Sequence, residues 1–103
     1  MTLETEPPLP IATAHVAIPT PPRYMNRLAK HFEHRVAVVR NERSASVAFQ
    51  DAPCTMQASD THLDIRIEAA DLAMLTRIQD VVAKHLNQVA SQETFDIEWS
   101  VAG

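Results

Sequence analysis

Glycine is nearly absent from this chain. Of the 103 residues, only the last, Gly103, is a glycine. Loops that cradle phosphate need internal glycines so that the backbone can approach the ligand closely, and the sequence therefore excludes a glycine-rich nucleotide-binding loop. Turns in the left-handed conformation must use other residues. We expect them at Asn41, Asp51 or Asp60, because Asn and Asp tolerate this conformation better than most residues.

Cysteine is equally scarce. The single Cys54 can form neither an internal disulfide nor a thiolate metal cage. It alternates with Met56 in a β-compatible stretch, which favours a small buried side chain over a nucleophile, because no base lies close to it in the sequence. This composition suits a reducing compartment, and we expect a cytoplasmic location.

An excess of positive charge and a long apolar run are also missing. The net charge is −4 and the Lys and Arg residues are scattered singly, so we expect no nucleic acid partner. No apolar run approaches the ~20 residues of a transmembrane helix. Glu4 and Glu6 stand where a secretory signal would carry cations. We therefore expect no association with a membrane.

The chain divides into a tail and one domain. Residues 1–10 contain three prolines and no apolar period, which indicates a disordered tail. Residues 11–103 form a single domain, since a chain of this length buries roughly two thirds of its surface in one core. Alternation of apolar and polar residues predicts strands, and these lie at 11–18, 36–40, 45–50, 53–58, 62–69 and 94–101.

Two segments have the apolar period of about 3.6 residues that is typical of amphipathic helices. The first runs from about Pro21 to His34, with Thr20 as its N-cap, and the second follows Asp71 as its N-cap and ends near Ala90. The second helix has the wider apolar arc, which comprises Leu72, Leu75, Ile78, Val82, Leu86 and Val89.

The predicted order of elements is β-α-β-β-β-β-α-β, an α+β fold. The sheet and both helices have one apolar face each, and they bury these faces together only if both helices cover the same side of the sheet. The sequence therefore predicts a two-layer sandwich with a mainly antiparallel sheet. We call the other side of the sheet the open face, and we expect it to carry Thr13, His15, Asp64, Arg66, Glu68, Asp96 and Glu98.

The open face has two interpretations. It is a solvated acidic exterior, or it is a docking surface for a protein, a small ligand or a second copy of the chain in a homodimer. The candidate partner-binding residues are the charged and imidazole side chains of that face, namely His15, Asp64, Arg66, Glu68, Asp96 and Glu98.

Histidine is comparatively abundant, with five in the chain, and the stretch HFEHR places His31 and His34 at the end of the first helix. Cations there complement the unpaired carbonyls and the negative end of the helix dipole, so both residues have a structural explanation. His85 lies inside the apolar arc of the second helix, where a partly buried imidazole needs a hydrogen-bond partner.

The same three histidines are candidate ligand-binding residues. If the helices lie side by side on the sheet, His31 and His85 approach each other, with His34 and either Glu33 or Glu68 within reach. Such a set suits zinc or iron. Two alternatives therefore stay open: no cofactor, with His85 as a satisfied core residue, or a histidine-based metal site with or without catalysis.

Three stretches carry a family resemblance, namely ATAHVAIPTPPRYMNRLAKHFEHRVAV, LDIRIEAADLAMLTRIQDVVAKHLNQVA and the closing IEW. They resemble the bacterial family called domain of unknown function 2218, from Ala12 to Trp99. The family pattern is matched at His31, Phe32, His34, His85, Leu86 and Trp99. The chain departs from the pattern where the family usually has glycine, at Arg43, Ser44, Asp51 and Ala52.

The resemblance implies a TATA-binding-protein-like arrangement of a curved sheet and two helices, and we keep a ferredoxin-like fold as the alternative. Members of the family stand alone or are attached to siderophore-interacting flavin reductases, which implies a setting near iron acquisition. Our first hypothesis is a non-catalytic module that binds a protein or small ligand, accessory to iron or siderophore utilisation. The second is a histidine-based zinc or iron protein.

Overall fold

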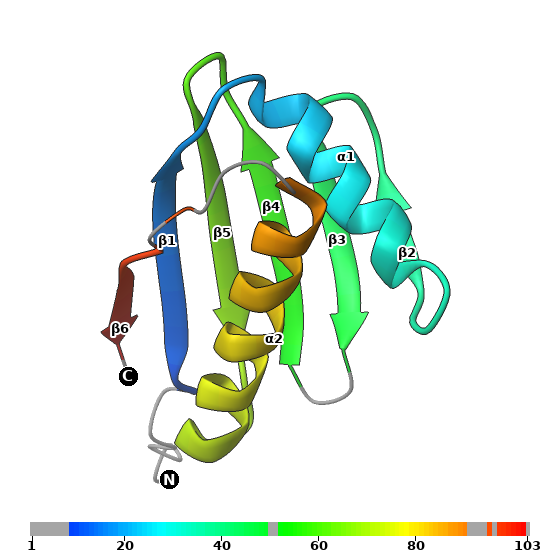
Figure 1. The fold of residues 1–103 in the computed structure, drawn as a ribbon. Coiled ribbons are helices and arrows are strands. Elements are labelled where there is room, and N and C mark those ends of the chain that lie inside the picture. Colours follow the sequence, from blue (N-terminus) through cyan, green and yellow to red (C-terminus); the bar gives the residue numbers. More distant parts are fainter. Residues whose placement is uncertain (1–8, 50–51, 91–94, 96, 103) are drawn as a thin grey trace, which may run out of the picture.

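The computed structural model describes residues 9–49, 52–90, 95 and 97–102, which form a sheet covered by helices (Figure 1). The tail predicted for residues 1–10 lies outside the described residues except for its last two. The elements follow the predicted order and are β1 (Ile11–Ala17), α1 (Pro21–Phe32), β2 (Val38–Arg40), β3 (Ser44–Phe49), β4 (Ala52–Ala58), β5 (His62–Glu68), α2 (Leu72–Ala90) and β6 (Trp99–Ala102).

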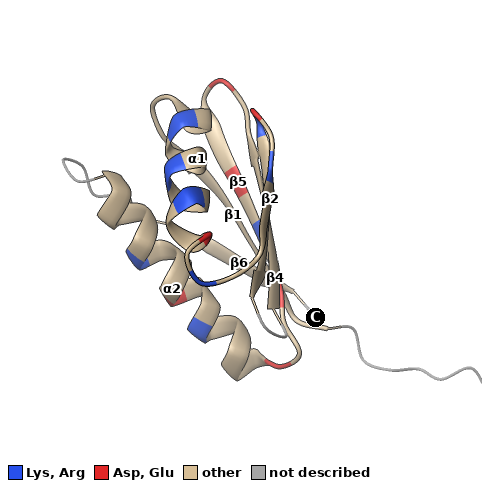
Figure 2. Ribbon diagram, turned by 90° about the vertical axis from the view of Figure 1, so that its right-hand side faces the viewer, with Lys and Arg blue, Asp and Glu red and all other residues tan. Residues whose placement is uncertain are grey.

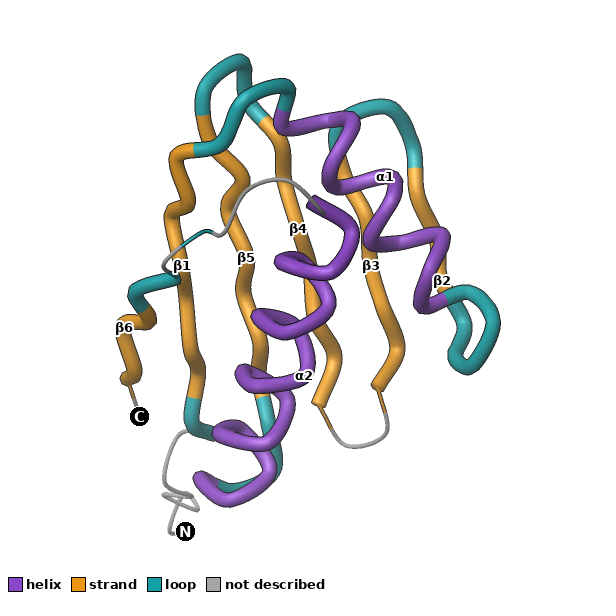
Figure 3. The backbone as a smooth tube through the Cα atoms, viewed as in Figure 1, coloured by secondary structure: helices purple, strands orange, loops and turns teal. Residues whose placement is uncertain are grey.

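The sheet has six strands in the order β2-β3-β4-β5-β1-β6, and all neighbours are antiparallel. Both helices lie on the same side of it, with α1 against β3 and α2 against β5 (Figures 1 and 3). The side view of Figure 2 separates the helix layer from the sheet layer. The predicted two-layer α+β sandwich is confirmed. Four strands between the helices distinguish it from a ferredoxin-like βαββαβ unit.

The core fills the space between the two layers. In β5, the side chains of Leu63, Ile65 and Ile67 are at most 1% exposed, while Asp64 and Arg66 between them are exposed. Burying one large aliphatic side chain fully contributes about 1.5–3 kcal/mol, so contact between the layers holds the fold together. The helices supply the fully buried side chains of Met25, Leu28, Leu75, Val82 and Leu86.

The residue with a left-handed backbone conformation lies at the start of α1. Thr20 has a φ of 45° and is the one described residue other than glycine with a positive φ. Pro21 keeps the residue before it out of the right-handed helical region, although the extended region is the usual alternative. The expectation for Asn41 and Asp60 is therefore wrong, and Asp51 lies outside the described residues. The Thr20 side chain makes no capping hydrogen bond, although Thr20 occupies the predicted N-cap position.

The ends of the other elements differ in detail from the prediction. Asp71 caps α2 as expected, because its Oδ1 accepts a hydrogen bond from the Met74 amide at 2.8 Å. Leu72 is 62% exposed and does not belong to the apolar arc. The last strand begins only at Trp99, and Val101, on this edge strand, is 53% exposed instead of buried.

Positive charge gathers on α1. Arg23, Arg27 and Lys30 are exposed and follow one another at helical spacing, so they share one side of the helix (Figure 2). The cations are therefore grouped in space, although they are scattered in the sequence. Neither helix of the described residues combines the length and apolarity that crossing a bilayer requires.

Candidate functional site

The open face is hollowed across four strands, and we call this concavity the open-face hollow. It has a volume of about 610 Å³ and opens broadly to solvent. Binding sites for small molecules usually have volumes of about 300–1,000 Å³, so the hollow has the size of a ligand site. It is lined mostly by polar residues from β1, β4, β5 and the β6 region, namely Thr13, Ala14, His15, Thr55, Met56, Gln57, Asp64, Ile65, Arg66, Glu98 and Ser100.

A row of hydrogen-bond donors crosses the middle of the hollow. Arg66 on β5 is paired with Thr55 on β4 and with Thr13 on β1, and Thr13 is paired in turn with Ser100 on β6. Directly paired residues of antiparallel strands hold their Cβ atoms about 4.5–5.5 Å apart. The guanidinium of Arg66 is therefore flanked by hydroxyl groups on both sides.

Arg66 also contacts the next outward-facing residue of its own strand. Its Nη2 lies 3.8 Å from Oε2 of Glu68, and the two side chains are 51% and 36% exposed. An ion pair this long and this exposed contributes little to stability. A guanidinium has five N–H donors, so this one contact leaves most of them available to a ligand.

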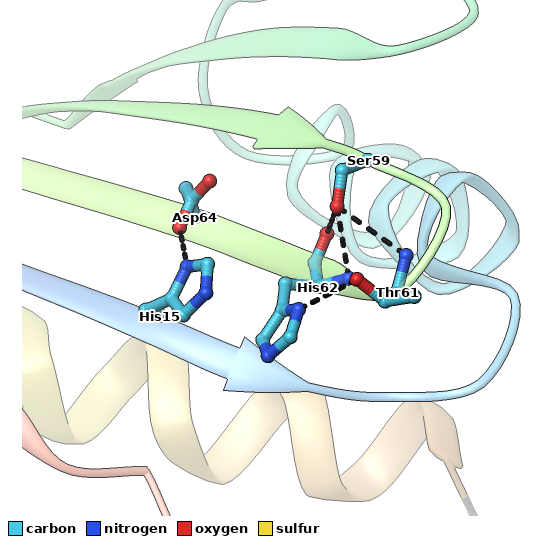
Figure 4. Close-up of polar contacts among 5 residues, drawn as sticks. All are labelled: His15, Ser59, Thr61, His62 and Asp64. Atoms are coloured by element: carbon cyan, nitrogen blue, oxygen red, sulfur yellow. Dashed lines mark hydrogen bonds and ion pairs between the residues drawn. The ribbon is translucent and has the colours of Figure 1, made fainter.

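A second row of side chains, two residues away along β5, carries hydrogen-bond acceptors. Asp64 on β5 is paired with Gln57 on β4 and with His15 on β1, and Glu98 also lines this part of the hollow. Nδ1 of His15 is hydrogen-bonded to Oδ1 of Asp64 (Figure 4). An ionised carboxylate only accepts, so Nδ1 of His15 carries the hydrogen of this bond.

His62 stacks on His15 beside this row. The ring centroids are 3.9 Å apart and the ring planes differ by 11°. The His62 ring is held in turn by Thr61, because Nδ1 of His62 lies 2.7 Å from Oγ1 of Thr61 (Figure 4). Oγ of Ser59 accepts the amides of Thr61 and His62 at 3.3 and 3.0 Å. The turn before β5 thus positions the second imidazole.

A separate histidine pair joins the two helices. The ring centroids of His31 on α1 and His85 on α2 are 4.7 Å apart, with the planes tilted by 43°. Nδ1 of His85 lies 2.6 Å from the carbonyl oxygen of Val81 and must donate to it, which leaves Nε2 with a lone pair. The Phe32 ring lies 5.3 Å from His85. The predicted approach of His31 to His85 is confirmed.

The wider metal-ligand set predicted around this pair is not assembled. Oε2 of Glu33 accepts a hydrogen bond from Nε of Arg40 at 2.8 Å, and Glu68 lies on β5 beside Arg66. The α1 helix ends at Phe32. His34 therefore lies beyond it and is exposed. Within the described part of the chain, no three His, Cys, Asp or Glu side chains gather closely enough to hold a metal ion.

The predicted partner-binding residues have different outcomes. His15, Asp64, Arg66 and Glu98 line the open-face hollow, Glu68 is half-buried beside it, and Asp96 lies outside the described residues. The sequence analysis missed four residues of this region, although the alternation within the predicted strands places all four on the open face. The missed residues are Thr55, Gln57, His62 and Ser100.

Cys54 does not belong to any site. It is 1% exposed, and burial raises the pKa of its thiol from the ordinary value of 9.0 to about 12. A thiol with this pKa stays protonated at neutral pH and is a poor nucleophile. The geometry agrees with the small buried side chain predicted from the sequence.

An open six-stranded antiparallel sheet with both helices on one side defines a small α+β domain. The family model described as "Uncharacterized protein conserved in bacteria (DUF2218)" matches residues 13–100, and the chain belongs to this family. The solved NMR structure of PA4090 from Pseudomonas aeruginosa is similar, with a TM-score of 0.74 and 32% identity, covering 87% of this chain and 94% of that chain. No curated protein matches the chain.

Proposed function

We propose that this chain is a non-catalytic binding module that takes a small polar ligand on its open face. The open-face hollow carries this proposal. Its volume suits a small molecule, and side chains of both charges, hydroxyls and an amide converge on it.

A protein partner or a second copy of the chain are the other possible occupants of this face. Protein interfaces bury about 800 Å² on each side and centre on aromatic and apolar side chains. The side chains that project into the hollow from β1, β4 and β5 are instead Thr13, His15, Thr55, Gln57, Asp64 and Arg66. This composition supports a small polar ligand.

The test is an NMR titration of the isotope-labelled chain with a panel of small polar compounds. We expect at least one compound to shift amide resonances of β1, β4 and β5 while those of α1 and α2 stay unchanged. The proposal is wrong if no compound perturbs these strands, or if all shifts fall on the helix layer. Light scattering supplies a second check, because a dimer that buries the hollow would assign this face to self-association.

The setting that we propose is cytoplasmic and accessory to iron or siderophore utilisation. Its support is the attachment of family members to siderophore-interacting flavin reductases, together with the lone reduced Cys54. We expect the abundance of the protein to rise when the cells are starved of iron. Equal abundance in iron-replete and iron-starved cells, measured by quantitative proteomics, would count against this setting.

A second candidate function, binding of zinc or iron, has support from the His31–His85 pair. Metal-bound histidines usually donate the other ring nitrogen to a carbonyl or carboxylate, as His85 does to Val81. Calorimetric titration with Zn²⁺ and Fe²⁺ tests the site. We expect binding that His31→Ala and His85→Ala each abolish and that His34→Ala retains. An unchanged affinity in the first two variants would exclude the pair as ligands.

A further inference from the structure

We infer that the open-face hollow recognises a zwitterion, and that a dipeptide with free termini is the ligand class that fits. This inference rests on the proposed function and names the ligand chemistry of that same site. The observation behind it is the alternation of charge along β5, where Asp64 and Arg66 both point into the hollow.

The spacing of Asp64 and Arg66 along β5 follows from strand geometry. Residues two apart on a strand share a face, and their Cα atoms are about 7 Å apart. Asp64 and Arg66 are two apart on the central part of the open face, between β4 and β1. An extended chain advances about 3.3–3.6 Å per residue, so the two termini of a dipeptide span the same distance.

The carboxylate of the ligand belongs at Arg66. The planar guanidinium pairs with a carboxylate through two parallel hydrogen bonds, and such charge-assisted bonds are the stronger ones. Thr55 and Thr13, the cross-strand partners of Arg66, add hydroxyl donors on either side. Its weak contact with Glu68, at 3.8 Å, leaves this end of the hollow open to a better-placed carboxylate.

The ammonium group of the ligand belongs at the acceptor row. Asp64 and Glu98 supply carboxylates, whose oxygens accept hydrogen bonds. An ammonium group has three donors. These acceptors can satisfy all three.

Ligands with a charge of one sign fit less well. The lining contains one cation, Arg66, and two carboxylates, Asp64 and Glu98. A simple anion would be repelled by the carboxylates, and a simple cation would be repelled by Arg66. A zwitterion aligned along β5 complements both ends, which is the reason to prefer a dipeptide to an isolated organic acid or amine.

The experiment compares three probes by NMR titration of the whole chain, namely alanyl-alanine, its N-acetyl form and its C-terminal amide. We expect alanyl-alanine to shift amides of β1, β4 and β5 and to bind about tenfold more tightly than either blocked form, because each blocked form loses one charged group. Equal affinity of all three probes would overturn the inference.

Two variants of the open face test which residue binds which end of the ligand. Arg66→Gln should weaken alanyl-alanine about tenfold and remove the preference over the amide, and Asp64→Asn should remove the preference over the N-acetyl form. Arg77→Gln and Asp80→Asn change the same residue types on α2, on the far side of the sheet, and should leave binding unchanged. An effect of the α2 variants as large as that of the open-face variants would also overturn the inference.

The result separates this inference from the proposed function. If alanyl-alanine causes no shift but another polar compound perturbs the open face, the dipeptide assignment fails while the binding module stands. If no compound perturbs that face, both fail.

Discussion

His15 and His62 stack face to face on the open face, with their ring centroids 3.9 Å apart. The register of β1 and β5 creates this contact, because His15 is paired with Asp64 and Ala17 is paired with His62, which places the two imidazoles on one diagonal. Asp64 holds one ring and the Thr61 hydroxyl holds the other. The stack keeps His15 in one orientation at the rim of the open-face hollow.

Asp64→Asn should release the His15 ring. The amide is a weaker acceptor than the carboxylate, so the stack with His62 loosens and the ring-current shifts of both imidazoles move toward free histidine. Stability should change by less than about 1 kcal/mol, since the two hydrogen-bonded side chains are 65% and 52% exposed. Histidine side-chain NMR spectra measure the first effect and urea unfolding the second. Unchanged imidazole shifts would contradict the role given to Asp64.

Two leucines at the start of α2 should respond very differently to truncation. Leu75 is 1% exposed, so Leu75→Ala should cost about 2–5 kcal/mol of unfolding free energy through lost burial and a cavity. Leu72 is 62% exposed, and Leu72→Ala should cost less than about 0.5 kcal/mol. Urea unfolding of the two variants compares them within one helix. Similar costs for both would mean that α2 is rotated relative to the sheet.

Thr20→Gly should stabilise the protein. A non-glycine residue in the left-handed region carries a cost of about 1–2 kcal/mol, and Thr20, with a φ of 45°, makes no side-chain cap hydrogen bond that the substitution would remove. Glycine also gives the unfolded chain more freedom, so we expect a net gain of about 0.5–1 kcal/mol. Thermal unfolding measures this gain. A lower midpoint for Thr20→Gly than for the parent chain would disprove the left-handed conformation.

Cys54 should make the fold less stable in alkali. Its pKa is raised from 9.0 to about 12 in the folded state, so between these values the unfolded thiol releases its proton while the folded thiol retains it. The unfolded state is therefore stabilised relative to the folded state. Between pH 9 and about 12, Cys54 contributes a loss of stability of about 1.4 kcal/mol per pH unit.

Cys54→Ala isolates this contribution, because every other titrating group is the same in both chains. The parent chain should lose stability more steeply than the variant above pH 9, as measured by urea unfolding at a series of pH values. Parallel pH profiles for the two chains would show that the thiol is not buried.

The regular elements were predictable because they repeat a simple pattern over several residues. Leu63, Ile65 and Ile67 alternate with charged residues, and this alternation predicted β5 with one buried face. The cap at Asp71 was also predictable, since its side chain bonds to an amide three residues away. Interactions of this range depend on local sequence alone.

The candidate site was only partly predictable. Arg66, Asp64 and His15 were predicted to face solvent on one side of the sheet, and they do. The hollow itself needed the order of strands in space, because it combines β4, β5, β1 and the β6 region, which lie far apart in the chain. Alternation places His62 on the same face as Asp64, but nothing near it in the sequence indicates a contact with His15.

The sequence by itself determined the element types, the buried faces and the two-layer arrangement, because apolar periodicity and the need to bury it act over a few residues at a time. Only the tertiary structure decided which side chains meet. Strand register brought Arg66 between Thr55 and Thr13, and helix packing brought His31 to His85, at sequence separations where the chain alone carries no distance information. Such pairings follow from the summed packing of the whole core, and no local pattern encodes them.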